Sequence, residues 1–133
     1  MDSTPHPYTD WLARYRRAWI DKDADAASRL FTEDALYREQ PFQAPFAGRA
    51  AIRDYWARVT ASQISVELRY GRSVVEGQRV AVEWWANLQT ADGPLTLAGE
   101  FLLRFADSGE CQELREYWLL TPARVEAPQG WGE

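Results

Sequence analysis

Apolar side chains recur at helical spacing near the start of the chain. Trp11, Leu12, Tyr15 and Trp19 fall on one face of a helix, and three arginines lie between them. A stripe with this period is typical of an amphipathic helix that packs one face on a core. The pattern therefore predicts a first helix over residues 8–21.

Two more helices and one strand are expected before residue 62. Asp23 is a suitable N-cap for a short second helix whose apolar positions lie within residues 26–31. A short strand is predicted at 35–39, followed by a proline-containing loop that ends at Gly48. Helical spacing of apolar residues returns after this loop and predicts a third helix over 49–61.

The period changes to two after Ser62. Turn residues separate four predicted strands, at 64–76, 79–90, 95–106 and 111–120. Three helices followed by a meander of antiparallel strands make an α+β pattern. Since neither layer can bury itself alone, we expect the helices to cover one face of a curved, mostly antiparallel sheet.

Alternation assigns the two faces of this sheet. The more apolar set, which we place inside, is Val80, Val82 and Trp84, then Gly99, Phe101, Leu103 and Phe105, and finally Leu114, Glu116 and Trp118. Glu116 is the one carboxylate in this inner set. The opposite face carries Trp85, Leu102, Tyr117 and Leu119, which predicts a homodimer formed through the outer sheet face.

Composition narrows the possible functions. The net charge of −5 argues against nucleic acid and against anionic membrane surfaces as partners. With Cys111 and His6 as its single cysteine and single histidine, the chain lacks the residues for a Cys/His metal site or a histidine-dependent triad. No apolar run approaches the length of a membrane span, and the start does not resemble a signal peptide, so a cytoplasmic location is expected.

Two parts of the chain resemble the SnoaL-like branch of the nuclear transport factor 2-like superfamily. The similar segments are Leu36–Phe42 with Gly48–Trp56, and Phe101–Phe105 with Leu114–Trp118. The resemblance covers about residues 8–121. It implies a cone in which a strongly bent sheet wraps on three helices, often as a homodimer. The family hosts isomerases, polyketide cyclases, epoxide hydrolases, dehydratases and non-catalytic binders, so the fold does not decide the function.

The outline is similar to that of steroid Δ5-3-ketoisomerase, but the catalytic positions hold other residues. The position of the carboxylate base corresponds to Gln40, and that of the tyrosine donor to Arg16, one step from Tyr15. The position of the protonated aspartate corresponds to Phe101. Glu39, beside Gln40, is expected to point to the opposite face of its strand. The resemblance therefore implies that this chain does not use the usual ketosteroid isomerase mechanism.

Candidate site residues follow from the inner face. Other catalytic members of the family keep an acidic residue on the last strands, and Glu116 is the residue that could fill this role here. Arg38 and Gln40 are expected to share the interior, so the catalytic candidates are Glu116, Arg38 and Gln40, with an Arg38–Glu116 ion pair favoured. The expected ligand-lining residues are Tyr15, Trp19, Trp56, Val82, Trp84, Phe101, Leu114 and Trp118. Core filling is the competing interpretation of these aromatic residues.

Two functions stay open. The first is a pocket protein that binds a small apolar or aromatic molecule, with or without cofactor-free isomerase, cyclase, dehydratase or hydrolase chemistry. The second is a non-catalytic dimeric interaction or scaffold module with a plugged cone. A cavity of roughly 300 Å³ or more beside Glu116 favours the first. Neither function calls for a cofactor, and the expected organisation is a flexible N-terminus at 1–7, one domain at 8–121 and a tail at 122–133.

Overall fold

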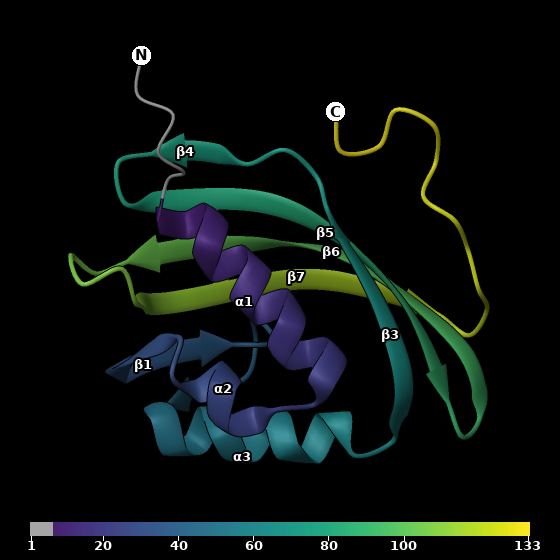
Figure 1. Cartoon of the computed structure of the whole chain (residues 1–133), viewed down its shortest axis with the longest axis horizontal. Helices are drawn as coiled ribbons and strands as arrows, with labels where there is room; N and C mark the ends of the chain where they lie inside the picture. The colour runs from purple at the N-terminus through teal and green to yellow at the C-terminus, as the bar shows by residue number, and fades with distance from the viewer. Residues whose placement is uncertain (1–6) are drawn as a thin grey trace.

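In the described part of the chain, three helices lie against one face of a seven-stranded sheet (Figure 1). The structure is a computed structural model that describes residues 7–133. The helices are α1 (Pro7–Asp21), α2 (Ala24–Ser28) and α3 (Arg49–Thr60). The expected flexible segment 1–7 lies outside the described residues apart from Pro7, the first residue of α1, and His6 lies outside them as well.

The sheet confirms the mostly antiparallel α+β arrangement. Its strands are β1 (Phe31–Arg38), β2 (Phe46–Ala47), β3 (Gln63–Tyr70), β4 (Val74–Glu76), β5 (Arg79–Thr90), β6 (Gly93–Phe105) and β7 (Cys111–Thr121). Their order is β2-β1-β7-β6-β5-β3, with β4 also paired to β5. The pairing of β1 with β7 is parallel and the other pairings are antiparallel. The long strands β5, β6 and β7 bend around α1 (Figure 1).

Most predicted elements are confirmed, and long-range contacts explain the differences. Asp23 caps α2 by accepting a hydrogen bond from the backbone N–H of Ala26 at 3.0 Å. Phe31 does not continue this helix, because it pairs with Cys111 of β7 and begins β1 four residues before the expected start at residue 35. The two-residue strand β2 was not predicted, and it forms by pairing with Leu36 and Tyr37.

The single strand predicted at 64–76 is two strands, β3 and β4, both paired with β5. The C-terminal tail enters at the break between them. The backbone N–H of Arg72 donates to the carbonyl oxygen of Gly132 at 2.8 Å. A Cβ on Gly71 would lie 2.8 Å from the Gly132 Cα, so the close approach of the tail requires glycine here.

The rest of the tail also packs on the outer face of the sheet. Residues 122–133 form no helix or strand. The Thr96 hydroxyl accepts a hydrogen bond from the Val125 N–H at 2.9 Å, and the Trp85 indole N–H donates to the Val125 carbonyl at 2.9 Å. The Trp131 ring packs edge to face on the Trp85 ring, with 5.8 Å between the ring centroids. The tail therefore covers part of the outer sheet face, which the sequence analysis had assigned to a dimer contact.

The face assignment of β5, β6 and β7 is confirmed. Val82, Trp84, Phe101 and Leu114 are buried against the helices, and Glu116 is buried on the same side. No helix in the described residues is long and apolar enough to cross a bilayer.

The assignment for β1 was wrong. Its parallel register sets Tyr37 beside Leu114 and Arg38 beside Arg115. Since Leu114 lies on the inner face, Tyr37 points inward and Arg38 outward. A shift of one residue along β1 thus exchanges the set of side chains that reaches the core.

Gly99 allows two tryptophans to lie in one row across the inner face. It pairs with Trp84 on one side and Trp118 on the other. A Cβ at this position would collide with the Tyr117 carbonyl oxygen and lie 2.7 Å from the Trp118 Cβ. The backbone of β6 must therefore stay free of a side chain here.

We expect Gly99→Ala to lower the free energy of unfolding by about 1–3 kcal/mol, since an inserted carbon forces the packed strands apart. Urea denaturation measures the loss. Gly109→Ala is the control, because a Cβ there meets nothing within 4 Å and only its φ of +88° is unfavourable. Its loss should stay near 1 kcal/mol. A Gly99→Ala protein as stable as the native chain would contradict the close packing of β6 on β7.

Candidate functional site

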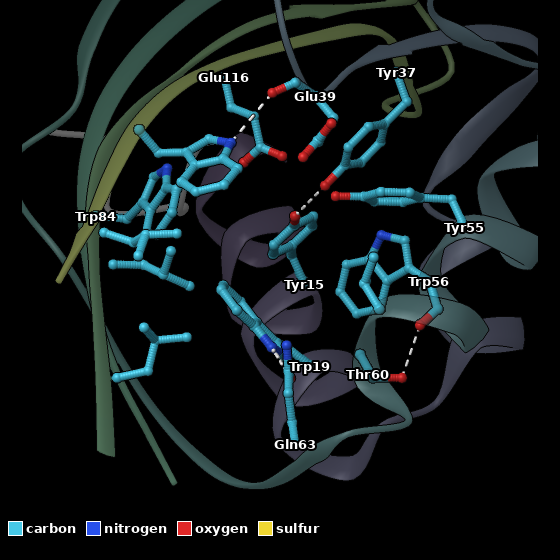
Figure 2. A pocket seen from close by; sticks show the side chains of 15 residues that line it. Tyr15, Trp19, Tyr37, Glu39, Tyr55, Trp56, Thr60, Gln63, Trp84 and Glu116 are labelled. Carbon is cyan, nitrogen blue, oxygen red and sulfur yellow. Dashed lines mark hydrogen bonds between the residues drawn. The ribbon is translucent and has the colours of Figure 1, made fainter. Parts of the chain in front are cut away.

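A cavity of about 220 Å³ lies between the inner face of the sheet and the helices α1 and α3 (Figure 2). Its aromatic walls are Tyr15, Trp19, Tyr37, Tyr55, Trp56, Trp84 and Trp118. Its other lining residues are Glu39, Val59, Thr60, Gln63, Leu95, Leu97, Glu116 and Leu120. Val59 and Leu120 are exposed, so the cavity reaches the surface beside them. The volume is below the roughly 300 Å³ that would favour a ligand-binding pocket over a plugged cone, so this cavity suits only a compact ligand.

The structure brings five of the eight predicted lining residues to this cavity. Tyr15, Trp19, Trp56, Trp84 and Trp118 all line it. The other three are buried in the core and do not line it: Val82, Phe101 and Leu114.

The aromatic rings stand steeply to one another around the cavity. The Trp19 ring makes an angle of 71° with Trp56 at 6.5 Å and of 72° with Trp84 at 5.9 Å. Tyr15 meets Trp56 at 85° and 5.1 Å. Trp19 is held in place because its indole N–H donates to the Gln63 side-chain oxygen at 2.8 Å. The rings thus form adjoining walls rather than a parallel stack.

Two carboxyl groups reach the same end of the cavity. Glu116 stands on β7 and is 7% exposed, while Glu39 follows the last residue of β1. Figure 2 shows both carboxyl groups pointing into one space above the tyrosine hydroxyls. The Trp118 indole N–H donates to the backbone carbonyl of Glu39 at 3.2 Å and fixes this turn of chain against β7.

Burial governs the ionisation of Glu116. Loss of hydration raises the pKa of Glu116 to about 8, and the charge of Glu39 acts in the same direction. A hydrogen-bonding interaction with the Tyr37 hydroxyl opposes the rise in pKa. At neutral pH the Glu116 carboxyl is therefore mostly protonated and can donate a proton.

Three phenols stand below the carboxyl groups and keep their protons. The Tyr15 and Tyr37 hydroxyls lie 2.8 Å apart, and that of Tyr55 points toward them (Figure 2). Burial first, and the charge of Glu116 second, raise the pKa of each of these tyrosines. All three remain hydrogen-bond donors throughout the physiological pH range.

The expected pairing of Arg38 with Glu116 was wrong. Arg38 lies on the outer face, where its Nε donates to Glu113 Oε2 at 2.7 Å. Burial works against ionisation of Glu113, but the hydrogen bond from Arg38 and the charges of Arg115 and Arg104 hold its pKa below the ordinary value. The parallel register of β1 is the physical reason, because it turns Arg38 away from the cavity.

The predicted positions of Gln40 and Glu39 were wrong, since Gln40 was expected in the interior and Glu39 on the opposite face. Gln40 borders a second hollow of about 580 Å³, which it shares with outer-face residues such as Trp85 and Tyr117. Glu39, expected on the far side of the strand, lines the cavity, and both Glu39 and Glu116 also border the second hollow. The signal that could have revealed Glu39 is the alternation of Ala35 and Tyr37, which extends to residue 39 with period two.

Comparison with known proteins agrees with this architecture. A model of the SnoaL-like domain matches residues 12–113. The chain belongs to the SnoaL-like domain family. No curated protein matches the sequence.

Three solved structures that share this fold are distant in sequence. A hypothetical protein of Catenulispora acidiphila DSM 44928 with a ketosteroid isomerase-like fold, in complex with trimethylamine, has 22% identity and a TM-score of 0.72, over 81% of this chain and 84% of that one. SalBIII, an epoxide hydrolase/cyclase-like enzyme with a role in pyran ring formation in salinomycin, has 21% identity and a TM-score of 0.75, over 86% and 95%. A putative scytalone dehydratase of Novosphingobium aromaticivorans DSM 12444 has 15% identity and a TM-score of 0.77, over 96% and 93%. At these identities the likeness establishes the fold alone.

The raised pKa of Glu116 makes the stability of the protein depend on pH. Because the folded-state pKa of about 8 exceeds the ordinary value of 4.5, folding favours the protonated carboxyl. The associated stability is complete below about pH 4.5 and is lost as the pH rises through 8, at about 1.4 kcal/mol per pH unit in between.

We expect Glu116→Gln to escape this loss, because the amide cannot ionise. Urea denaturation should find the variant and the native chain similarly stable near pH 5 and the variant more stable, by up to a few kcal/mol, near pH 9. Glu76→Gln, an exposed change on β4, is the control and should follow the native profile. Parallel profiles for Glu116→Gln and the native chain would show that Glu116 is solvated.

Proposed function

We propose that this SnoaL-like protein is a cofactor-independent acid–base enzyme that acts on a compact, largely apolar molecule. The observation that carries the proposal is the buried Glu116 carboxyl, whose pKa burial raises, beside Glu39 at one end of an aromatic cavity. Titratable groups with perturbed pKa values in a concave apolar site are typical of catalytic centres.

The two carboxyl groups complement one another. Glu116 donates its proton to an oxygen of the substrate, such as an epoxide, a leaving hydroxyl or a carbonyl. Glu39 accepts a proton from the attacking hydroxyl, from water or from carbon. The pair holds one proton before and after the reaction, so the proton balance closes without an external acid or base. Each proton transfer contributes about 10²- to 10⁴-fold in rate.

The surrounding side chains support this chemistry. The hydroxyl of Tyr55 and one hydroxyl of the Tyr15–Tyr37 pair supply neutral donors toward the oxygen on which charge develops, because the bond between Tyr15 and Tyr37 uses the other proton of that pair. The indole walls lower the polarity around the reacting groups, which strengthens each electrostatic interaction within the cavity. Ring closure on an epoxide, epoxide hydrolysis, dehydration and isomerisation all need this combination of groups.

The comparisons support the same range of reactions. SalBIII is described as epoxide hydrolase/cyclase-like, and the Novosphingobium protein as a putative scytalone dehydratase. The alternative, a scaffold module with a plugged cone, is disfavoured by the cavity of about 220 Å³ that extends to the surface.

We expect a panel of compact epoxides, β-hydroxyketones and β,γ-unsaturated ketones to include a substrate, with products measured by mass spectrometry. Because the acid must be protonated, kcat should fall as the pH rises above about 8. Glu116→Gln and Glu39→Gln should each lower kcat by about 10²- to 10⁴-fold with little change in KM. Glu76→Gln should keep full activity, and the proposal fails if Glu116→Gln does so too.

We also propose that the protein is a homodimer through the uncovered part of the outer sheet face. Leu119 is 81% exposed there, and Tyr117 and Leu102 are 41% and 36% exposed. Arg115 and Glu100 lie between these apolar side chains and offer charges for pairing across a two-fold axis. The tail covers the adjacent Trp85, so the contact is confined to the β6–β7 side of the sheet.

We expect light scattering to give a particle of about twice the 15.3 kDa chain mass. Leu119→Asp should convert it to the monomer, since a buried unpaired charge opposes association. Val74→Asp alters a residue of β4 that is 71% exposed and serves as the control. A native chain that is monomeric at micromolar concentration would contradict the dimer.

A further inference from the structure

The two carboxyl groups of the cavity lie apart from the arginine side chains of the protein. Glu39 and Glu116 both line the cavity, and no Lys, Arg or His is among the described residues around it. Arg38 is held on the outer face by Glu113. Arg58 lies over the rings of Phe46 and Tyr55, at 5.8 and 5.9 Å, and does not line the cavity. The carboxyl pair therefore has no cationic side chain within the cavity to neutralise it.

The indole rings among the remaining walls suit a cation that carries apolar substituents. Trp is the side chain whose ring face attracts cations most strongly, and four tryptophans line this cavity: Trp19, Trp56, Trp84 and Trp118. Their rings are steeply inclined, by 71° and 72° from Trp19 to two of its neighbours. A compact cation within the cavity can therefore contact several ring faces at once.

Other ligand charges fit this cavity less well. An anion would be repelled by the carboxyl pair, and a neutral hydrocarbon would leave the charge of the half-buried Glu39 without a partner in the cavity. A bare ammonium or guanidinium needs acceptors on several sides, but the carboxyl groups stand at one end only (Figure 2). An alkylated nitrogen spreads its charge over methyl or methylene groups that pack on the rings.

We propose that the cavity selects a compact organic monocation with an alkyl-substituted nitrogen, held between the tryptophan rings and the Glu39–Glu116 pair. The proposal rests on the proposed function in taking this cavity as the substrate site, and it adds the class of substrate. A single positive charge is opposite in sign to the carboxyl pair and balances one carboxylate of it.

Binding of such a cation should be linked to pH. The titratable groups that face Glu116 are Tyr37 and Glu39 from β1 and its end, Tyr15 from α1 and Tyr55 from α3. From β6, the neighbour of Glu116 is Phe101, which does not titrate. A nearby cation favours the ionised form of Glu116, so binding releases protons. The affinity should rise with pH, by at most about tenfold per unit, and level off once Glu116 is ionised in the free protein.

The experiment compares choline with 3,3-dimethylbutan-1-ol, a neutral molecule of the same shape. Tryptophan fluorescence and calorimetry measure both affinities between pH 6 and 9. We expect choline to bind at least tenfold more tightly and to release protons, which calorimetry in buffers of different ionisation enthalpy detects. Glu39→Gln should remove most of the preference, and Glu116→Gln should flatten the pH dependence. Glu76→Gln should bind as the native chain does.

The outcomes separate this inference from the proposed function. Equal binding of the two compounds, or no binding of choline, overturns the inference, whereas loss of turnover in Glu116→Gln would still support acid–base catalysis. Preferred binding of choline together with full turnover by Glu116→Gln supports the inference and overturns the proposed function. Substitution of the partly buried Trp118 gives a further test. Trp118→Leu should weaken the binding of choline more than that of the alcohol. Trp118→Phe should restore part of the difference in affinity.

Discussion

The parallel pairing of β1 with β7 is the constraint on which the chemistry of this SnoaL-like protein depends. It sets Tyr37 beside Leu114 and Arg38 beside Arg115. With that register, Tyr37 and then Glu39 point toward Glu116, and the arginine between them points away. A register shifted by one residue would place a cation beside Glu116 and remove the second carboxyl group. The cavity would then hold a neutralised ion pair instead of a proton-bearing pair of acids.

The two faces of the sheet treat charge in opposite ways. On the outer face, Glu113 is surrounded by Arg38, Arg104 and Arg115, and these interactions lower its pKa. On the inner face, Glu116 of the same strand has no such partner and its pKa rises to about 8. Glu113 and Glu116 thus lie only three positions apart on β7. The ionised form of Glu113 stabilises the fold, whereas ionisation of Glu116 destabilises it. Such a cost in stability is common where a site is built for chemistry.

The aromatic residues connect the site to the fold. Trp84 is almost fully buried and belongs to the core, yet its ring also lines the cavity. Trp118 joins β7 to the chain that carries Glu39 through its indole N–H. Gly99 stands between these two indoles and leaves the room that both rings occupy. Packing and ligand contact therefore involve the same side chains, so substitutions that reshape the cavity also affect stability.

Elements with local signals could be predicted from the residues alone. Helical spacing located α1 and α3, the Asp23 cap located α2, and alternation placed Glu116 on the inner face of β7, because each of these patterns is contained within one element. The face of β1 is different, since alternation permits two assignments and the choice depends on pairing with a strand more than seventy residues later. Because of that pairing, Glu39 lines the cavity and Arg38 forms an ion pair with Glu113. The break between β3 and β4 and the anchoring of the tail likewise depend on contacts between residues far apart in the chain, such as Gly71 with Gly132. Such features could not be predicted, because the interactions that stabilise them involve distant partners that no local pattern identifies.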